Sequence, residues 1–238
     1  MSSPDLFSQS PPTPTEPADS VAALAALGEE ARECRRCHLA ETRTQVVFGE
    51  GNPTAPLVFV GEGPGETEDA TGRPFVGRAG KLLDELLRAV GMTREHVYIC
   101  NTVKCRAADR AGNRWRNRPP TTEEIAACRH WLDLQLQTIA PLVIVCVGAP
   151  AAKTLIKPSF AITRERGQWF THSPYAPWIT AILHPAYLLR LHGPNGDAAR
   201  KQSIADIEAA RRKVIEARRE QRQTAAPAQP TQGTLFEL

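Results

Sequence analysis

The sequence predicts an α/β protein: a three-layer α/β/α sandwich around a central, mostly parallel four-stranded sheet. Four short apolar runs rich in β-branched residues have the composition of buried strands, and helical segments separate them along the chain. Alternation of strands and helices favours parallel strands joined by crossover helices, which cover both faces of the sheet. The expected strands span residues 57–61, 97–101, 142–148 and 178–183.

The expected helices rest on apolar periodicity and on capping signals. Residues 81–90 place five apolar side chains on one helical face, and the pattern stops at Gly91. A second helix begins at Thr121, which stands three residues before Glu124 in a capping-box spacing, and runs to about Thr138. The other expected helices cover residues 21–33, 149–156 and 198–222, and the last of these is long and basic.

Length and composition indicate one globular domain with tails. Of the 238 residues, 42% are hydrophobic, which is enough to bury a core, and no apolar run has the length of a membrane span. The polar amino terminus lacks the apolar stretch of a signal peptide, so we expect a cytoplasmic location and no membrane partner. We expect a domain at 21–222, a disordered segment at 1–20 and a flexible tail at 223–238.

Polar motifs follow the expected strands, at the edge where open parallel sheets bind ligands. A glycine-rich acidic segment, residues 61–69, comes directly after the first strand, and His184 follows the last one. Asn101 ends the second strand, and its amide offers one donor and one acceptor, which suits an imide edge. A tight turn or a phosphate nest is the alternative for the glycines, although the carboxylates would repel a phosphate. We expect Glu62 to polarise a water or to stabilise a developing cation in a pocket shared with His184.

The cysteines form a second candidate site. Six cysteines in a chain without a signal peptide favour metal binding or burial over disulfides. Four thiolates hold zinc or an iron–sulfur cluster, and unrelated buried thiols are the alternative. Cys100 and Cys146 lie inside apolar strands and are expected in the core. The candidate ligands are a CxxC pair and two later cysteines: Cys34, Cys37, Cys105 and Cys128.

Five ordered motifs connect the chain to a known family. They are VFGEGNP at 47–53, GEGPGETED at 61–69, TGRPFVGRAGKLL at 71–83, NTVKCR at 101–106 and HPAYLLR at 184–190. Over roughly residues 24–215 the chain resembles the family 4 uracil-DNA glycosylases, the bacterial and archaeal iron–sulfur type. The resemblance implies a base-excision repair enzyme that flips uracil out of DNA and hydrolyses its N-glycosidic bond, leaving an abasic site. A non-catalytic or redox-regulated iron–sulfur module that binds damaged DNA is the alternative.

The resemblance also implies roles for the site residues. It implies that uracil stacks on Phe75, that Asn101 reads its polar edge, and that His184 lies near the carbonyl O2 while Glu62 acts in hydrolysis. It implies a 4Fe–4S cluster held by Cys34, Cys37, Cys105 and Cys128. Further substrate-binding residues are expected in the first motif after the strand, where the turn at 65–68 would exclude the thymine methyl: Gly61, Gly63, Pro64, Gly65 and Glu68.

Two segments are expected to contact DNA. Leu188, Leu189 and Arg190 would fill or brace the space that the flipped base leaves, and ordinary packing at a helix start is the alternative. Twenty-two residues separate Cys105 from Cys128, more than the family usually shows. Within them, residues 106–118 carry five arginines against one aspartate, and we expect this segment to loop out. Arg106 and its neighbours are candidate phosphate contacts, with a solvated loop as the alternative.

The far carboxyl terminus lies outside the resemblance. Gln232 is followed by the apolar pair Leu235 and Phe236 at the end of a linker-like segment. This short pattern resembles the motif by which bacterial repair proteins dock on the replicative sliding clamp, and a tail without function is the alternative. We expect the clamp as a partner, beside uracil-containing DNA, single- or double-stranded, and we expect the protein to be a monomer.

Overall fold

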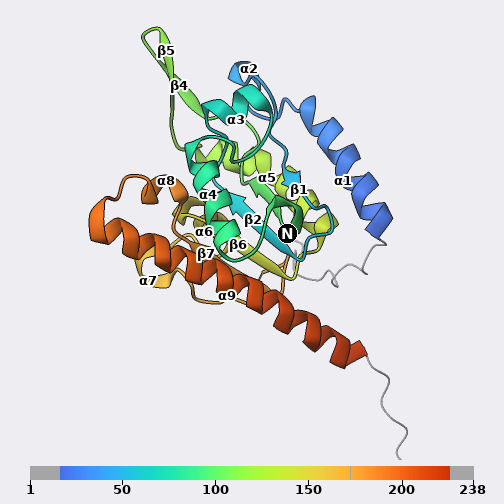
Figure 1. The fold of residues 1–238 in the computed structure, drawn as a ribbon. Helices are drawn as coiled ribbons and strands as arrows, with labels where there is room; N and C mark the ends of the chain where they lie inside the picture. The colour runs from blue at the N-terminus through green and yellow to red at the C-terminus, as the bar shows by residue number, and fades with distance from the viewer. Residues whose placement is uncertain (1–16, 172, 226–238) are drawn as a thin grey trace, which may run out of the picture.

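A five-stranded sheet forms the centre of the computed structural model, which describes residues 17–171 and 173–225 (Figure 1). The strand order is β1-β3-β2-β6-β7; the last four are parallel to one another, and β1 pairs antiparallel with β3. The expected α/β class with a mostly parallel sheet is therefore confirmed. The strands are β1 (Glu50–Gly51), β2 (Leu57–Gly61), β3 (Tyr98–Asn101), β6 (Val143–Val147) and β7 (Trp178–Ile182).

The expected number of four strands is wrong, because β1 adds a short edge strand. Glu50 pairs with Ile99 and Gly51 with Tyr98. Gly51 has a φ of +119°, and a Cβ added there would lie 2.2 Å from the carbonyl oxygen of Val97, so this close approach requires glycine. A strand of two partly exposed residues carries no apolar run, which is why periodicity does not reveal it.

Helices cover both faces of the sheet and complete three layers (Figure 1). Side chains alternate along each strand, so Phe59 points into one core, while Val58 and Val60 point into the other. The first core is covered by α4 (Arg78–Ala89), α8 (Pro185–Leu188) and α9 (Gly193–Ala225). The second core is covered by α1 (Pro17–Arg32), α5 (Thr122–Ile139) and α6 (Ala149–Leu155).

The capping signal of α5 is confirmed. Thr121 Oγ1 accepts a hydrogen bond from Glu124 N at 3.3 Å, and the Glu124 carboxylate accepts one from Thr121 N at 2.7 Å. Three other helices begin earlier than expected, α1 at Pro17, α4 at Arg78 and α9 at Gly193. Short elements that periodicity does not reveal complete the fold: α2 (Leu39–Thr42), α3 (Glu66–Thr71), the 3₁₀ turn η1 (Arg94–His96) and α7 (Ile162–Glu165).

The arginine-rich segment is a β-hairpin and not the expected loop. Its strands β4 (Ala108–Ala111) and β5 (Arg114–Asn117) pair antiparallel and project from the body of the domain (Figure 1). Gly112, with a φ of +62°, and Asn113 form the two-residue turn. A Gly-Asn pair between two short runs is a recognised hairpin signal, so this element was within reach of sequence reasoning.

The expectations for residues 1–16 and for the tail beyond residue 225, with its Gln232 and Leu235–Phe236 motif, lie outside the described residues. Within the part of the chain that is described, no helix has the length and apolarity needed to span a lipid bilayer.

Candidate active site

The ends of β2, β3 and β7 open into one pocket of about 570 Å³. Glu62 follows the last residue of β2, Asn101 ends β3, and His184 stands two residues after β7. All three side chains line the pocket together with Phe75. Parallel strands thus bring together residues that lie up to 122 positions apart in the sequence (Glu62 to His184). The expected shared pocket exists.

Asn101 presents an amide oxygen that lacks a partner. Its side chain is 1% exposed, and Oδ1 has no hydrogen-bond partner among the described residues. Gly61 makes room for it, because a Cβ at Gly61 would lie 2.4 Å from Asn101 Oδ1 and 2.4 Å from Phe75 Cζ. A buried oxygen without a partner is costly, so this wall of the pocket suits a ligand that brings a donor.

His184 is held as a neutral donor. Its Nδ1 accepts a hydrogen bond from Ala186 N at 3.0 Å, which leaves the proton on Nε2. Burial, reinforced by the positive charge of Arg190 and opposed by Glu68, lowers the pKa of His184 to about 4. Gly148, at the end of β6, lets the ring sit close, since a Cβ there would lie 2.9 Å from His184 Cβ. Near pH 7 the ring therefore offers an uncharged N–H.

Glu62 combines a fixed backbone with a carboxylate on the pocket wall. Its carbonyl oxygen accepts hydrogen bonds from Thr102 Oγ1 at 2.5 Å and from Val103 N at 3.1 Å. Burial raises the pKa of the Glu62 carboxyl above its ordinary value. A raised pKa makes this carboxylate a stronger proton acceptor than one in water.

Phe75 forms an aromatic wall and stands in an unusual conformation. Its φ is +52°, in the left-handed region that a bulky residue rarely adopts, and its ring lies 5.9 Å from that of His184 at 30°. Arg94 donates to the carbonyl oxygens of Pro74, at 2.9 Å, and of Phe75. The surrounding structure therefore imposes this backbone conformation, as is typical of functional sites.

Glu68 lines the pocket, but both oxygens of its carboxylate already accept hydrogen bonds from backbone N–H groups. Oε1 accepts from Val76 N at 2.9 Å and from Gly77 N at 2.7 Å, and Oε2 accepts from Gly65 N at 3.2 Å. The side chain thus ties the start of α3 to the loop that carries Phe75. Gly63, Pro64 and Gly65 line the pocket as expected for the turn after β2.

The expected DNA contacts at the end of β7 divide into two groups. Leu188 is 0% exposed in the core beneath α8, so its expected contact with DNA is wrong for this conformation, and ordinary helix packing describes it. Leu189 and Arg190 line the pocket, and the Arg190 guanidinium lies 5.9 Å from the ring centre of Tyr187.

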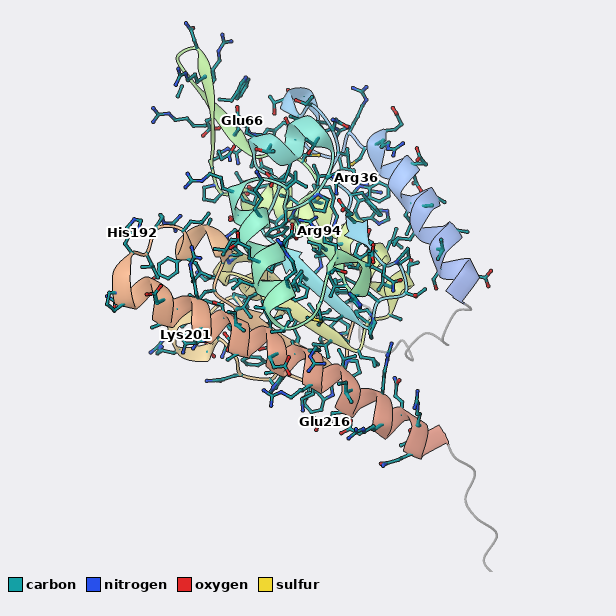
Figure 2. The ribbon with its side chains drawn as sticks, in the orientation of Figure 1. Arg36, Glu66, Arg94, His192, Lys201 and Glu216 are labelled. Atoms are coloured by element: carbon teal, nitrogen blue, oxygen red, sulfur yellow. The ribbon has the colours of Figure 1, made fainter. Side chains whose placement is uncertain are left out.

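Arg106, the other expected DNA contact, lies at the base of the hairpin. Its Nε donates a hydrogen bond to Asn117 Oδ1 at 2.6 Å, and Glu66 lies at the same place (Figure 2).

The four candidate ligand cysteines converge on a second cavity. They come from the segment between α1 and α2, from the chain after β3 and from α5. Arg43 Nη1 donates to Cys105 Sγ at 3.4 Å, and the backbone N of Lys104 donates to Cys128 Sγ at 3.2 Å. Burial raises the pKa of the Cys105 thiol to about 12 and raises that of Cys128 as well. Cys100 and Cys146 are buried in strands, which confirms them as core residues.

The chemistry of this cavity fits an iron–sulfur cluster. The candidate ligand atoms are all sulfur, the donor type that holds such clusters. Hydrogen bonds from Arg43 to Cys105 and from Lys104 N to Cys128 favour the thiolate form of these two cysteines. Trp131 lines the same cavity, and its buried indole N–H has no acceptor among the described residues. Across the described ranges, no three His, Cys, Asp or Glu residues are grouped tightly enough to hold a single metal ion. The thiols instead surround a cavity.

Comparison with known proteins identifies the family. The sequence profile of the Uracil DNA glycosylase superfamily matches residues 48–208, and the chain belongs to this superfamily. It is 49% identical over 173 residues to a type-4 uracil-DNA glycosylase of Thermotoga maritima, covering 71% of this chain and 83% of that one. It is 44% identical over 157 residues to a type-4 enzyme of Archaeoglobus fulgidus, covering 63% and 75%.

A type-5 uracil-DNA glycosylase of Thermus thermophilus is more distant, at 29% identity over 144 residues, 54% of this chain and 61% of that one. The resemblance to the type-4 family is therefore confirmed, and with it the uracil-DNA glycosylase activity in DNA repair.

Some residues that shape the site are not evident from its motifs. Arg94 clamps the Phe75 loop from η1, and only the distances in the structure reveal this. Lys104 is 1% exposed, and its Nζ donates to the carbonyl oxygen of Asn101 at 2.8 Å and to Gln135 Oε1 at 2.6 Å. A lysine inside a motif next to a strand end was a signal that could have suggested a buried role.

Proposed function

We propose that this uracil-DNA glycosylase binds its flipped base in the pocket at the ends of β2, β3 and β7. Glu62, Phe75, Asn101 and His184 carry recognition and catalysis. The observation that supports this assignment is the convergence of these four side chains on one pocket. A base in a duplex cannot reach such a pocket unless it leaves the stack.

Recognition of uracil follows from the Asn101 amide. Uracil presents N3–H as a donor and O4 as an acceptor, and a carboxamide meets both with its oxygen and its NH₂ group. The buried Asn101 Oδ1, without a partner in the described structure, supports this role because N3–H would satisfy it. Cytosine presents the reverse pattern and would leave opposed groups unpaired, at a cost of roughly 1–3 kcal/mol for each.

Catalysis follows from the charges that form as the N1–C1′ bond breaks. The electrons of this bond leave with uracil as an anion, and the sugar becomes cationic. His184 Nε2–H donates to O2 of the departing base, and its neutral state means that the proton stays on the ring while the anion is stabilised. Glu62 orients a water and accepts its proton as the oxygen bonds to C1′, and its negative charge favours the cationic sugar.

The cluster proposal rests on the second cavity. Cys34, Cys37, Cys105 and Cys128 would hold a 4Fe–4S cluster, which supplies cross-links between three segments of the chain when bound. Lys104, next to Cys105, joins this region to Asn101 through the backbone carbonyl. The pocket residues already supply the hydrolytic groups, so the cluster acts as a structural element.

DNA is the partner that the family activity requires, and we place the enzyme in the cytoplasm because bacterial and archaeal chromosomes lie there. A monomeric state and clamp binding by the tail stay predictions. Uracil release from a defined oligonucleotide tests the function, with cytosine, thymine and hypoxanthine in the same position as controls. We expect release of uracil, and we expect Asn101→Asp to move selectivity toward cytosine. Absence of release from any uracil substrate would refute the function.

A further inference from the structure

The hairpin of β4 and β5 with its turn, residues 108–117, is built to be exposed. Residues 109–117 are all exposed, and Trp115 keeps 44% of its surface in solvent. A two-stranded hairpin is marginally stable by itself, and an exposed tryptophan adds little to its stability. Tryptophan and arginine, which this hairpin presents side by side, are enriched among the residues that contribute most of the binding energy at interfaces. The sequence of the tip therefore points to a partner outside the fold.

The base of this hairpin is held firmly to the domain. Arg118 N donates to the carbonyl oxygen of the buried Ala107 at 3.0 Å. The Arg118 guanidinium forms two hydrogen bonds with the Glu124 carboxylate, at 2.6 and 2.8 Å, and one with Asp109 at 2.9 Å. An anchored base gives the exposed tip a defined direction.

The hairpin continues the wall of the active site. Asn117 and Arg118 line the pocket. The register pairs Arg110 with Trp115 and Ala108 with Asn117. Since opposed residues share a face and side chains alternate along a strand, Trp115 and Arg110 lie on the face that carries Asn117. Arg114 lies on the other face. The Asn117 side chain is the one that reaches toward the pocket, because a Cβ built on the pocket residue Gly65 would lie 3.5 Å from Asn117 Nδ2, whereas the Arg118 guanidinium turns to Asp109 and Glu124. Trp115 and Arg110 thus extend from the face whose Asn117 side chain borders the pocket.

The charge and spacing of this face match a DNA strand. Residues 108–117 contain one acidic side chain, Asp109, and Arg118 forms an ion pair with it. The arginines of the hairpin therefore give its tip a positive charge. An aromatic ring beside a guanidinium is the combination that binds unpaired bases and their phosphates. Trp115 lies two residues from Asn117, roughly 7 Å along the strand. One strand of B-DNA advances about 3.4 Å along the helix axis for each nucleotide, and an unpaired strand extends further per nucleotide, so this offset corresponds to one or two nucleotides.

We propose that Trp115 stacks on an unpaired base about one or two nucleotides from the flipped uracil on the same strand, and that Arg110 contacts the adjoining phosphate. The proposal rests on the proposed function, because the uracil pocket fixes where the strand begins. It adds a second base-binding position to the site and predicts a preference for substrates in which the neighbouring base is unpaired.

Equilibrium binding to an oligonucleotide with a tetrahydrofuran abasic analogue tests the proposal without catalysis. We expect Trp115→Ala to weaken binding of the single strand by about 5- to 150-fold, the range for one lost stacked base. Trp115→Phe should retain most of the wild-type affinity, because phenylalanine can still stack on a base. The loss should be smaller on a fully paired duplex. Arg110→Ala should lower the slope of log K against log salt by about 0.7, the value for one phosphate contact on a single strand.

A second readout locates the stacked base. We expect 2-aminopurine placed one or two nucleotides from the analogue to be quenched by the wild type and not by Trp115→Ala, and a probe six nucleotides away to be unaffected. Arg114→Ala removes the same charge from the opposite face and is the matched control. Iron content and thermal unfolding verify that each variant folds.

Three results would overturn the proposal: Trp115→Ala binding within twofold of wild type, no position-dependent quenching, or equal effects of Arg110→Ala and Arg114→Ala on the salt slope. Uracil release by the wild type separates this failure from failure of the function. If uracil is released and Trp115→Ala binds normally, only the hairpin proposal fails. If uracil is not released, the function itself fails.

Discussion

At the scale of single residues, burial shifts the pKa values of the proposed base Glu62 and the proposed donor His184 in opposite directions. It raises the pKa of Glu62 and lowers the pKa of His184 to about 4. Both shifts follow from one cause, since loss of water penalises whichever form is charged. The result is a strong carboxylate base beside an uncharged donor, which suits a reaction that creates a cation on the sugar and an anion on the base.

The first residue-scale prediction concerns the rate of uracil release. Glu62→Ala and His184→Ala should each slow single-turnover release by about 100- to 1000-fold, because each removes one charge-stabilising group. Both residues stand after strand ends, so the fold should survive, as circular dichroism and thermal unfolding would verify. Near-wild-type rates for both variants would refute the assignment of this pocket.

The second residue-scale prediction concerns stability and pH. The folded pKa of His184, about 4, lies below the value of 6.5 expected in the unfolded chain. As pH falls through 6.5, the unfolded state gains a proton that the folded state does not take up until about pH 4, so stability is lost across this window. The difference in unfolding free energy between wild type and His184→Ala should shrink from pH 7.5 to pH 4.5 in urea titrations. A difference that stays constant across this range would contradict the neutral assignment of the ring.

At the scale of elements, the loop that carries Phe75 is clamped by three neighbours. Glu68 on α3 binds its backbone N–H groups, Arg94 on η1 binds its carbonyl oxygens, and α4 approaches at Gly80. A Cβ on Gly80 would lie 1.7 Å from the carbonyl oxygen of Phe75, so the helix touches the loop where only glycine fits. The position of the aromatic wall is therefore set by packing between elements.

The element-scale prediction uses this contact. Gly80→Ala should displace the Phe75 loop and lower uracil release by about 100-fold, the loss typical of a displacement near 1 Å. Gly28→Ala in α1 is the matched control, because its added Cβ would meet Phe48 at an ordinary 3.4 Å. If Gly80→Ala does not fold, Arg94→Lys tests the same clamp from the other side. Full activity in both Gly80→Ala and Arg94→Lys would show that uracil release does not depend on the position of the Phe75 loop.

At the scale of the whole molecule, the cysteine cavity lies where three segments outside the central sheet meet. The CxxC pair follows α1, Cys105 follows β3, and Cys128 lies in α5. A cluster at this point would fasten the amino-terminal helix and the root of the hairpin to the catalytic core. We therefore expect the fold of this region and the loading of the proposed cluster to be coupled.

The first whole-molecule prediction tests this coupling with two buried cysteines. Cys128→Ala should lose most of the bound iron and lower the unfolding midpoint by about 10 °C, several times the 2–4 °C expected per kcal/mol at this size. Cys146→Ala removes a thiol of similar burial from β6 and should keep its iron. Iron analysis and the visible absorption band measure both. Stoichiometric zinc without iron in anaerobically prepared wild type would refute the cluster.

The second whole-molecule prediction concerns the tail, which lies outside the described residues. A peptide of residues 228–238 should bind the bacterial sliding clamp, because an apolar pair on a tether provides an anchor and raises local concentration. Leu235→Ala with Phe236→Ala should abolish clamp binding and leave uracil release from free oligonucleotides unchanged. Equal clamp binding by the full chain and by a chain ending at residue 229 would exclude this function.

Long periodic segments and motifs were sufficient to predict the four parallel strands, the capped helix α5 and the meeting of Glu62, Asn101 and His184 in one pocket. The reason is that an apolar run has few alternatives to a buried strand, and the carboxyl ends of parallel strands share one edge of the sheet. The family motifs added Phe75, which follows no strand and has no local signal for its role.

Tertiary structure alone decided the remaining features. Burial of Leu188, the edge strand β1 and the clamp by Arg94 depend on residues far apart in the chain. The Glu68 carboxylate accepts from N–H groups three to nine residues away, which only the folded loop brings to it. The shift of the His184 pKa has the same origin, because it depends on how much water the folded pocket excludes. Residue types and their spacing thus determined which chemical groups reach the site, and three-dimensional packing determined which of them stay free to act.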